Sequence, residues 1–208
     1  MSCFEGDKKL QNVIIPSACT TIGSSAFAYC SSLTSINIPD GITVIPYSCF
    51  SSCTEMSTIT GCKNVSSIGE YAFANSHLTS YPFGNSLKSI DRSAFQYSYL
   101  VSVTIPGSVR TIGEYAFYAC SYLEEVIFEE GNTFVGSHMF LRCKQLSKVS
   151  LASTITRIDY GAFCEVGIET IALPTGLTDL VEACFYECPN LVSIDIPTGV
   201  TRIYLRRT

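Results

Sequence analysis

The chain has 208 residues, of which 47% are hydrophobic and only 15% are charged, and its formal net charge is −5. Disordered chains combine low hydrophobicity with high charge, so this composition excludes a disordered protein. The acidic balance also argues against a general nucleic-acid-binding protein, whose surface carries an excess of Lys and Arg.

The N-terminal residues 1–9 contain neither the basic start nor the apolar core of a secretory signal peptide. No segment approaches the roughly 18 consecutive apolar residues of a transmembrane helix, so we expect no membrane insertion. Taken as written, the sequence predicts a soluble cytoplasmic protein or a piece of a longer one.

Phenylalanine recurs along the whole chain in steps of 22 or 23 residues, as Phe4, Phe27, Phe50, Phe73, Phe95, Phe117, Phe140, Phe163 and Phe185. A Leu, Ile or Met residue lies 17 positions before each Phe from Phe27 onward. A fixed period of this length is typical of a solenoid, in which each unit contacts only its neighbours. We therefore predict one domain over residues 1–208, with a partial unit at 1–9 and a C-terminal edge at 204–208. Its repeat units start near residues 10, 33, 56, 78, 100, 123, 146, 168 and 191.

Within each unit the apolar positions recur in the same order, as residues 100–117 illustrate. Alternation at Val103 and Ile105 predicts a short strand with one face inward. Pro106 then ends the strand because it has no N–H to continue a ladder, and a second short extended segment follows at 109–112. Twenty-odd residues leave room for one helical turn at most, so we expect little helix.

Two units depart from this pattern. Gly61-Cys62 and Phe83-Gly84 replace the Ile-Pro pair that ends the first strand elsewhere. The regularity of the strand is therefore doubtful in both units.

The cysteines follow the length of the turn between each Phe and the next aliphatic residue. When that step is six residues, the third residue after Phe is Cys in every case but the first, namely Cys30, Cys53, Cys120, Cys143 and Cys188. A side chain that depends on loop length is most simply a packing element, and a thiol can also donate weakly to a backbone carbonyl. We expect free thiols; disulfides between neighbouring units are the alternative. A metal site is disfavoured because the C-x₃-C spacings at residues 49–53 and 184–188 are not the tight hooks of zinc sites.

The consensus L-x-x-I-x-I-P-x-x-[VI]-T-x-I-G-x-x-A-F-x-x-C is clearest in residues 33–39 and 112–120. It resembles the BspA-like leucine-rich repeat family over residues 2–203. The resemblance implies a repeat solenoid, mainly β: a right-handed leucine-rich solenoid of about nine units. It also implies a cell-surface protein that attaches to host matrix proteins or cells. No binding residue transfers, because the family motif is structural.

Stacked parallel units make equivalent positions lateral neighbours, so charges in one column are expected to alternate in sign. Three columns obey this rule: Glu70/Arg92/Glu114, Arg157/Asp179/Arg202 and Glu125/Lys148. Lys88 and Arg110 break it.

Catalytic chemistry finds little support in the sequence. The only histidines, His77 and His138, lie about three units apart, so they cannot form one site. Neither has a Cys and a carboxylate in a convincing column for nucleophilic catalysis. We expect no enzyme activity, no cofactor and no metal.

Recognition of a protein ligand is the remaining hypothesis, because a solenoid exposes long regular faces. The candidate binding residues are Tyr97, Tyr99, Tyr118 and Tyr122 on consecutive turns, followed by Glu124 and Glu125. Exposed tyrosines are typical of interfaces, although packing at the edge would also explain them. The acidic run at 124–130 favours a basic partner, with a solvated face as the alternative.

The ends of the repeat lead to a further expectation. The unit at 1–9 is partial, and the next Phe of the series would fall on Thr208. We expect a fragment or a chain that pairs end to end, with residues 204–207 as a candidate charged cap. The predicted function is adhesin-like surface recognition, and an intracellular scaffold is the alternative. The expected localisation is the cell surface for the first and the cytoplasm for the second.

Overall fold

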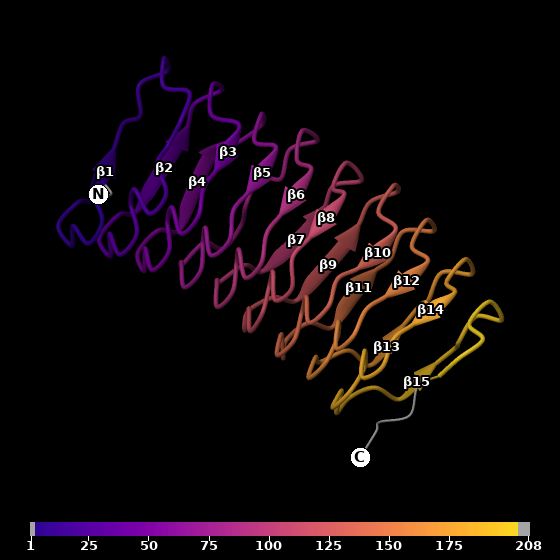
Figure 1. Cartoon of the computed structure of the whole chain (residues 1–208). Coiled ribbons are helices and arrows are strands. Elements are labelled where there is room, and N and C mark those ends of the chain that lie inside the picture. Colours follow the sequence, from indigo (N-terminus) through magenta and orange to yellow (C-terminus); the bar gives the residue numbers. More distant parts are fainter. Residues whose placement is uncertain (1–2, 204–208) are drawn as a thin grey trace.

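The computed structural model describes residues 3–203, and over these residues the chain is a parallel β-solenoid without helix (Figure 1). It makes about eight turns, slightly fewer than the nine units expected. The first and the last strand lie at opposite ends of the stack. The candidate cap at residues 204–207 lies outside the described residues.

Short strands form two columns that run along the solenoid. The first column holds β1 (Asn12–Val13), β2 (Ser35–Ile38), β4 (Thr58–Gly61), β7 (Ser102–Ile105), β9 (Glu125–Phe128), β11 (Lys148–Ser150), β13 (Thr170–Ile171) and β15 (Ser193–Ile194). The second column holds β3 (Val44–Ile45), β5 (Ser67–Ile68), β6 (Ser89–Ile90), β8 (Thr111–Ile112), β10 (Phe134–Val135), β12 (Arg157–Ile158) and β14 (Asp179–Leu180). The first column divides into sheets β1-β2-β4, β7-β9-β11 and β13-β15, and the second into β3-β5-β6-β8 and β10-β12-β14.

The predicted register is confirmed by the strand pairing. Ser102 lies opposite Glu125, and Glu125 opposite Lys148, so equivalent positions of successive units are neighbours. In β7 the side chains alternate between exposed and buried, with Val103 and Ile105 inside the solenoid. This alternation is the pattern expected of a strand with one face on the core.

The two irregular units behave differently. No strand forms at residues 78–84, where Pro82 has no N–H for a ladder, and the first column is interrupted there. Tyr81 and Phe83 fill this position, with ring centroids 5.3 and 5.6 Å from that of Phe95. Strand β4 nevertheless forms, because Gly61 adopts a φ of +81° where any Cβ would collide with the Ile38 carbonyl.

The periodic phenylalanines form one continuous stack through the core. Neighbouring ring centroids, from Phe4 to Phe185, lie 5.2–5.6 Å apart, with interplanar angles of 1–15°. The six inner rings from Phe50 to Phe163 are fully buried. Offset stacking of this kind adds to the free energy gained by burying the rings.

The corner around each Phe uses an unusual backbone. Residues two before and two after the Phe adopt left-handed conformations, as Ser25 (φ 54°) and Tyr29 (φ 61°) do around Phe27. Phe27 N–H then donates to the Cys49 carbonyl at 3.0 Å, and Tyr29 N–H donates to the Ser51 carbonyl at 2.7 Å. The corners are therefore tied to one another by backbone hydrogen bonds, although they contain no strand.

The cysteines occupy the turn position that their spacing predicts. Each of the five loop thiols donates to the carbonyl of the Phe in the preceding unit, with S···O distances of 3.0–3.1 Å. All eleven cysteines are free thiols. The predicted packing role of the thiol, including its contact with a carbonyl, is confirmed.

Candidate protein-binding surface

The four candidate tyrosines form two ring pairs on the turns that follow the Phe corners. Tyr97 and Tyr118 meet edge to face at 5.2 Å, and Tyr99 and Tyr122 stack at 4.7 Å. Tyr97, Tyr99 and Tyr122 are 45, 36 and 47% exposed. The hydrogen bond between the Tyr97 and Tyr118 hydroxyls raises the pKa of Tyr97.

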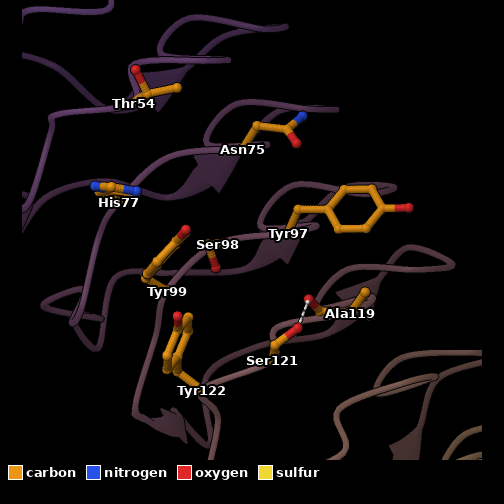
Figure 2. A pocket seen from close by; sticks show the side chains of 9 residues that line it. All are labelled: Thr54, Asn75, His77, Tyr97, Ser98, Tyr99, Ala119, Ser121 and Tyr122. Atoms are coloured by element: carbon orange, nitrogen blue, oxygen red, sulfur yellow. Dashed lines mark hydrogen bonds between the residues drawn. The ribbon is translucent and has the colours of Figure 1, made fainter.

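Three of these rings border a shallow groove of about 440 Å³, which we call the tyrosine groove. Figure 2 shows Tyr97 on one side and Tyr99 and Tyr122 on the other, with Ser98 and Ser121 between them. Its lining residues are Thr54, Asn75, His77, Tyr97, Ser98, Tyr99, Ala119, Ser121 and Tyr122. The groove crosses several units of the stack, so it exists only when these units are folded together.

His77 belongs to this site, although the sequence drew attention to it only as a catalytic candidate. Its ring centroid lies 4.1 Å from that of Tyr99, which continues the stacked column Tyr99–Tyr122 by one more ring. All three residues directly precede the aliphatic residue that starts a unit. This shared position was the signal that could have identified His77 as part of the surface.

Tyr118 lines a second hollow, together with Arg92, Tyr115 and Arg142. Arg142 Nη1 donates to the Tyr118 hydroxyl at 3.0 Å, and its Nε donates to Glu165 at 3.2 Å. These bonds raise the pKa of Arg142, with the bond to Glu165 as the larger cause. The structure thus places Tyr118 in contact with Tyr97 but outside the lining of the tyrosine groove.

The two candidate glutamates also lie outside the tyrosine groove. Glu125 belongs to β9 and Glu124 precedes it. Later in the same acidic run, Glu129 accepts from Gly107 N–H at 3.1 Å, and Glu130 accepts from the Ser153 backbone N–H at 2.8 Å. The hydrogen bonds from Ser153 lower the pKa of Glu130. Part of the acidic run is therefore engaged in joining neighbouring units.

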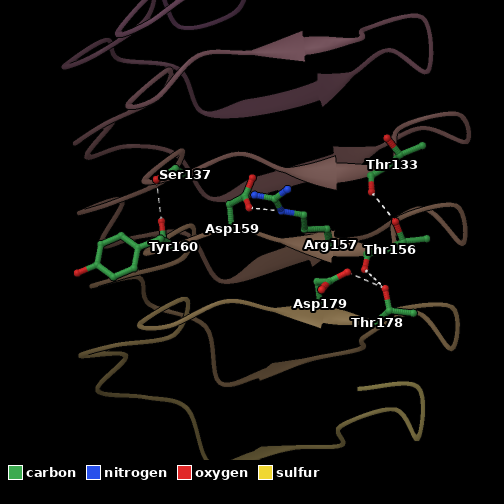
Figure 3. A network of polar contacts seen from close by, with 8 residues as sticks. All are labelled: Thr133, Ser137, Thr156, Arg157, Asp159, Tyr160, Thr178 and Asp179. Carbon is green, nitrogen blue, oxygen red and sulfur yellow. Dashed lines mark hydrogen bonds and ion pairs between the residues drawn. The ribbon is translucent and has the colours of Figure 1, made fainter. Parts of the chain in front are cut away.

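Residues of the predicted charge columns are lateral neighbours, but they do not form ion pairs with one another. Arg157 lies opposite Asp179, as predicted, yet its guanidinium pairs with Asp159. Figure 3 shows that Asp179 instead accepts from the Thr178 hydroxyl at 2.8 Å. Glu114 pairs with His138 at 3.0 Å rather than with Arg92. Ion pairs between equivalent positions of neighbouring units do occur outside the predicted columns, between Arg142 and Glu165 and between Lys63 and Asp40.

Serine and threonine hydroxyls connect successive units along the second column. Figure 3 shows the Thr156 hydroxyl donating to the Thr133 carbonyl and the Thr178 hydroxyl donating to the Thr156 carbonyl, at 3.3 and 3.2 Å. Many of the short polar side chains therefore reinforce the stack.

Most of the thiols with a shifted pKa have it raised by burial. Cys120 is the exception, because its burial is outweighed by hydrogen bonds with Cys143 and Ser98, which lower its pKa. Burial raises the pKa of Cys164 to about 11 and that of Cys53 to about 12. A reactive cysteine needs a lowered pKa, which basic neighbours or a helix N-terminus provide. Among residues 3–203 no group of three or more His, Cys, Asp or Glu side chains is arranged to hold a metal ion.

Comparison with known proteins identifies the repeat. The family model described as BspA type Leucine rich repeat region, present in six copies, matches residues 1–101 and 88–206. The chain belongs to this family. Its leucine-rich repeats are consistent with a protein-binding module, and families of this kind are typically non-enzymatic. Among curated protein sequences, none matches this chain significantly.

Solved structures with the same fold include two bacterial leucine-rich repeat proteins. One, from Bacteroides ovatus ATCC 8483, is 22% identical with a TM-score of 0.65, over 83% of this chain and 57% of its own. The other, the T. pallidum leucine-rich repeat protein, is 26% identical with a TM-score of 0.65, over 74% of this chain and 75% of its own. This chain thus spans little more than half of the B. ovatus protein. Over its described part, no helix is long and apolar enough to cross a bilayer.

Proposed function

We propose that the protein is a non-enzymatic recognition module that binds a protein partner through its tyrosine surface, in the manner of a surface adhesin. The observation that carries this proposal is the group of exposed rings at Tyr97, Tyr99 and Tyr122, joined by Tyr118 through its contact with Tyr97. Tyrosine is enriched at interfaces because its ring is apolar and its hydroxyl bonds to water or to a partner.

The rigidity of the underlying corner supports the same proposal. Tyr97 N–H donates to the Tyr118 carbonyl at 2.8 Å, and Ala119 N–H donates to the Leu141 carbonyl at 2.8 Å. A surface whose backbone is held in this way loses little conformational entropy on binding. Membership in a leucine-rich repeat family is the second line of support.

The test is binding of the purified protein to a panel of extracellular matrix proteins by surface plasmon resonance. We expect the double variant Tyr97→Ala/Tyr118→Ala to weaken binding at least tenfold, because both rings leave the surface. Tyr29→Ala is the matched control: it removes a 55% exposed tyrosine at the position equivalent to Tyr97, three units away. Equal binding by the double variant and the control would refute the tyrosine surface as the interface.

An intracellular scaffold remains the alternative, with the same surface and a cytoplasmic partner. Surface biotinylation of intact cells separates the two, because only the adhesin is labelled. End-to-end self-association also remains a prediction, and sedimentation velocity at rising concentration tests it.

A further inference from the structure

We infer that the tyrosine groove binds a neutral saccharide carried by the partner. The inference rests on the proposed function, because it specifies the ligand chemistry that this same surface recognises. Three properties of the groove carry it: its charge, its free hydrogen-bonding groups and the arrangement of its rings.

The groove is uncharged in an acidic protein. Its nine lining residues include no Asp, Glu, Lys or Arg, whereas the chain carries a net charge of −5. A phosphate, a carboxylate or an ammonium group would find no opposite charge there to offset its loss of water. The absence of charge in the lining therefore favours a ligand that is itself neutral.

The groove also holds polar groups that have no partner in the described part of the protein. Among the described residues, none forms a hydrogen bond with the side-chain amide of Asn75, the imidazole of His77 or the hydroxyls of Tyr99 and Tyr122. The amide and the hydroxyls each both donate and accept. Sugar hydroxyls do the same, so they can satisfy both roles of these groups at once.

A proline-rich peptide is the main competing occupant, because such peptides bind grooves lined by aromatic residues. Proline has no N–H, so a run of prolines offers only carbonyl acceptors. It would leave the acceptor oxygen of Asn75 without a donor, and a polar group that loses water without gaining a partner costs affinity. The hydrogen-bonding groups of the groove thus favour the saccharide.

The rings supply the apolar part of the site. Tyr97 stands on one wall, and Tyr99 and Tyr122 stand on the other, so a ligand in the groove contacts aromatic carbon on both sides (Figure 2). A pyranose has one face of C–H groups and a rim of hydroxyls, which matches aromatic walls with the Asn75 amide beside Tyr97 and with Ser121 between the walls. The groove is open and shallow, so we expect a dissociation constant on the order of 1 mM for a free trisaccharide.

The test is a titration of the ¹⁵N-labelled full chain, followed by ¹H–¹⁵N correlation spectra. The probes are lactose, N-acetyllactosamine, mannotriose and cellotriose, with decaproline as the competing ligand. We expect at least one saccharide to shift the amide signals of residues 75–77, 97–99 and 119–122 with saturation. Decaproline should leave them in place.

Variants connect the shifts to the groove. Tyr99→Ala should weaken saccharide binding at least tenfold, and Tyr122→Phe, which loses only the hydroxyl, about threefold. Tyr29→Ala should bind like the unmodified chain, and the dispersion of the spectra reports that each variant is folded. The inference is overturned if no saccharide shifts the groove signals, if only decaproline does, or if Tyr99→Ala and Tyr29→Ala bind equally.

The two proposals can fail separately. If matrix proteins bind through Tyr97 and Tyr118 but no saccharide binds, the inference is wrong and the proposed function stands. If saccharides bind in the groove but no protein of the panel binds, the protein-binding function is the one refuted.

Discussion

Single thiols join consecutive units of this solenoid. Cys143 is fully buried, and its Sγ lies 3.1 Å from the Phe117 carbonyl of the unit before. In the shorter turns the equivalent position holds a smaller or branched residue; Ser98 there contacts the Cys120 thiol at 3.3 Å. The identity of one side chain and the length of its turn are therefore coupled by the space available beneath the turn.

We expect Cys143→Ala to lower the free energy of unfolding by about 1–3 kcal/mol, because it leaves a cavity and removes the donor to the Phe117 carbonyl. Urea denaturation followed by circular dichroism measures the loss. Cys3→Ala, at an exposed thiol, is the control and should change stability by less than about 0.5 kcal/mol. Similar losses in the two variants would show that the buried contact is not stabilising.

At the scale of the element, the repeating structure is the Phe corner rather than the strand. The first strand column is interrupted at residues 78–84, yet the ring stack continues from Phe73 through Phe95 to Phe117 at 5.2 and 5.3 Å. Tyr81 and Phe83 pack beside it where the strand is missing. The stack, the backbone bonds of the corners and the second-column ladder β5-β6-β8 therefore hold the solenoid together across the gap.

Phe95→Ala is expected to cost about 3–5 kcal/mol, because a fully buried ring is lost and both stacking neighbours lose their contact. Phe4→Ala is the matched control, since Phe4 is 41% exposed and, among residues 3–203, stacks on Phe27 alone. We expect the control to cost about 1 kcal/mol. Thermal unfolding by calorimetry compares them, and equal costs would refute the dominance of the inner stack.

For the molecule as a whole, many buried thiols make stability sensitive to alkaline pH. Burial raises the pKa of Cys53 and Cys184 to about 12, from 9.0 for an exposed thiol. Above pH 9 the unfolded chain loses these protons while the folded chain keeps them. The contribution of these thiols to the free energy of unfolding is therefore fully present below pH 9, and it is lost as the pH rises toward 12.

The urea midpoint should accordingly be lower at pH 10 than at pH 8. Each strongly shifted thiol contributes up to about 1.4 kcal/mol of this loss per pH unit above 9. A Cys53→Ala chain should lose less between the two pH values than the unmodified chain, because one titrating thiol is gone. Identical midpoints at pH 8 and pH 10 would contradict the burial of the thiols.

Much of this architecture could be predicted from the sequence, because the period of the repeat fixes which residues of successive units are neighbours. The step from Phe95 to Phe117 places the two rings in neighbouring units, and the pairing of Ser102 with Glu125 follows from the same period. The buried positions of the strands and the turn position of the cysteines could be predicted from local spacing alone. The left-handed corners were not predicted, because residues such as Tyr97 carry no glycine signal for a positive φ.

The sequence by itself thus determined the period, the register, the buried faces and the slots of the cysteines, since each depends on spacing along one chain. Only the tertiary structure decided which polar and aromatic groups share a surface. It placed His77 and Asn75 in the tyrosine groove, and directed Tyr118 and Glu124 elsewhere. The physical reason is that a side chain's direction depends on corner geometry and on neighbours from adjacent units, which spacing does not encode.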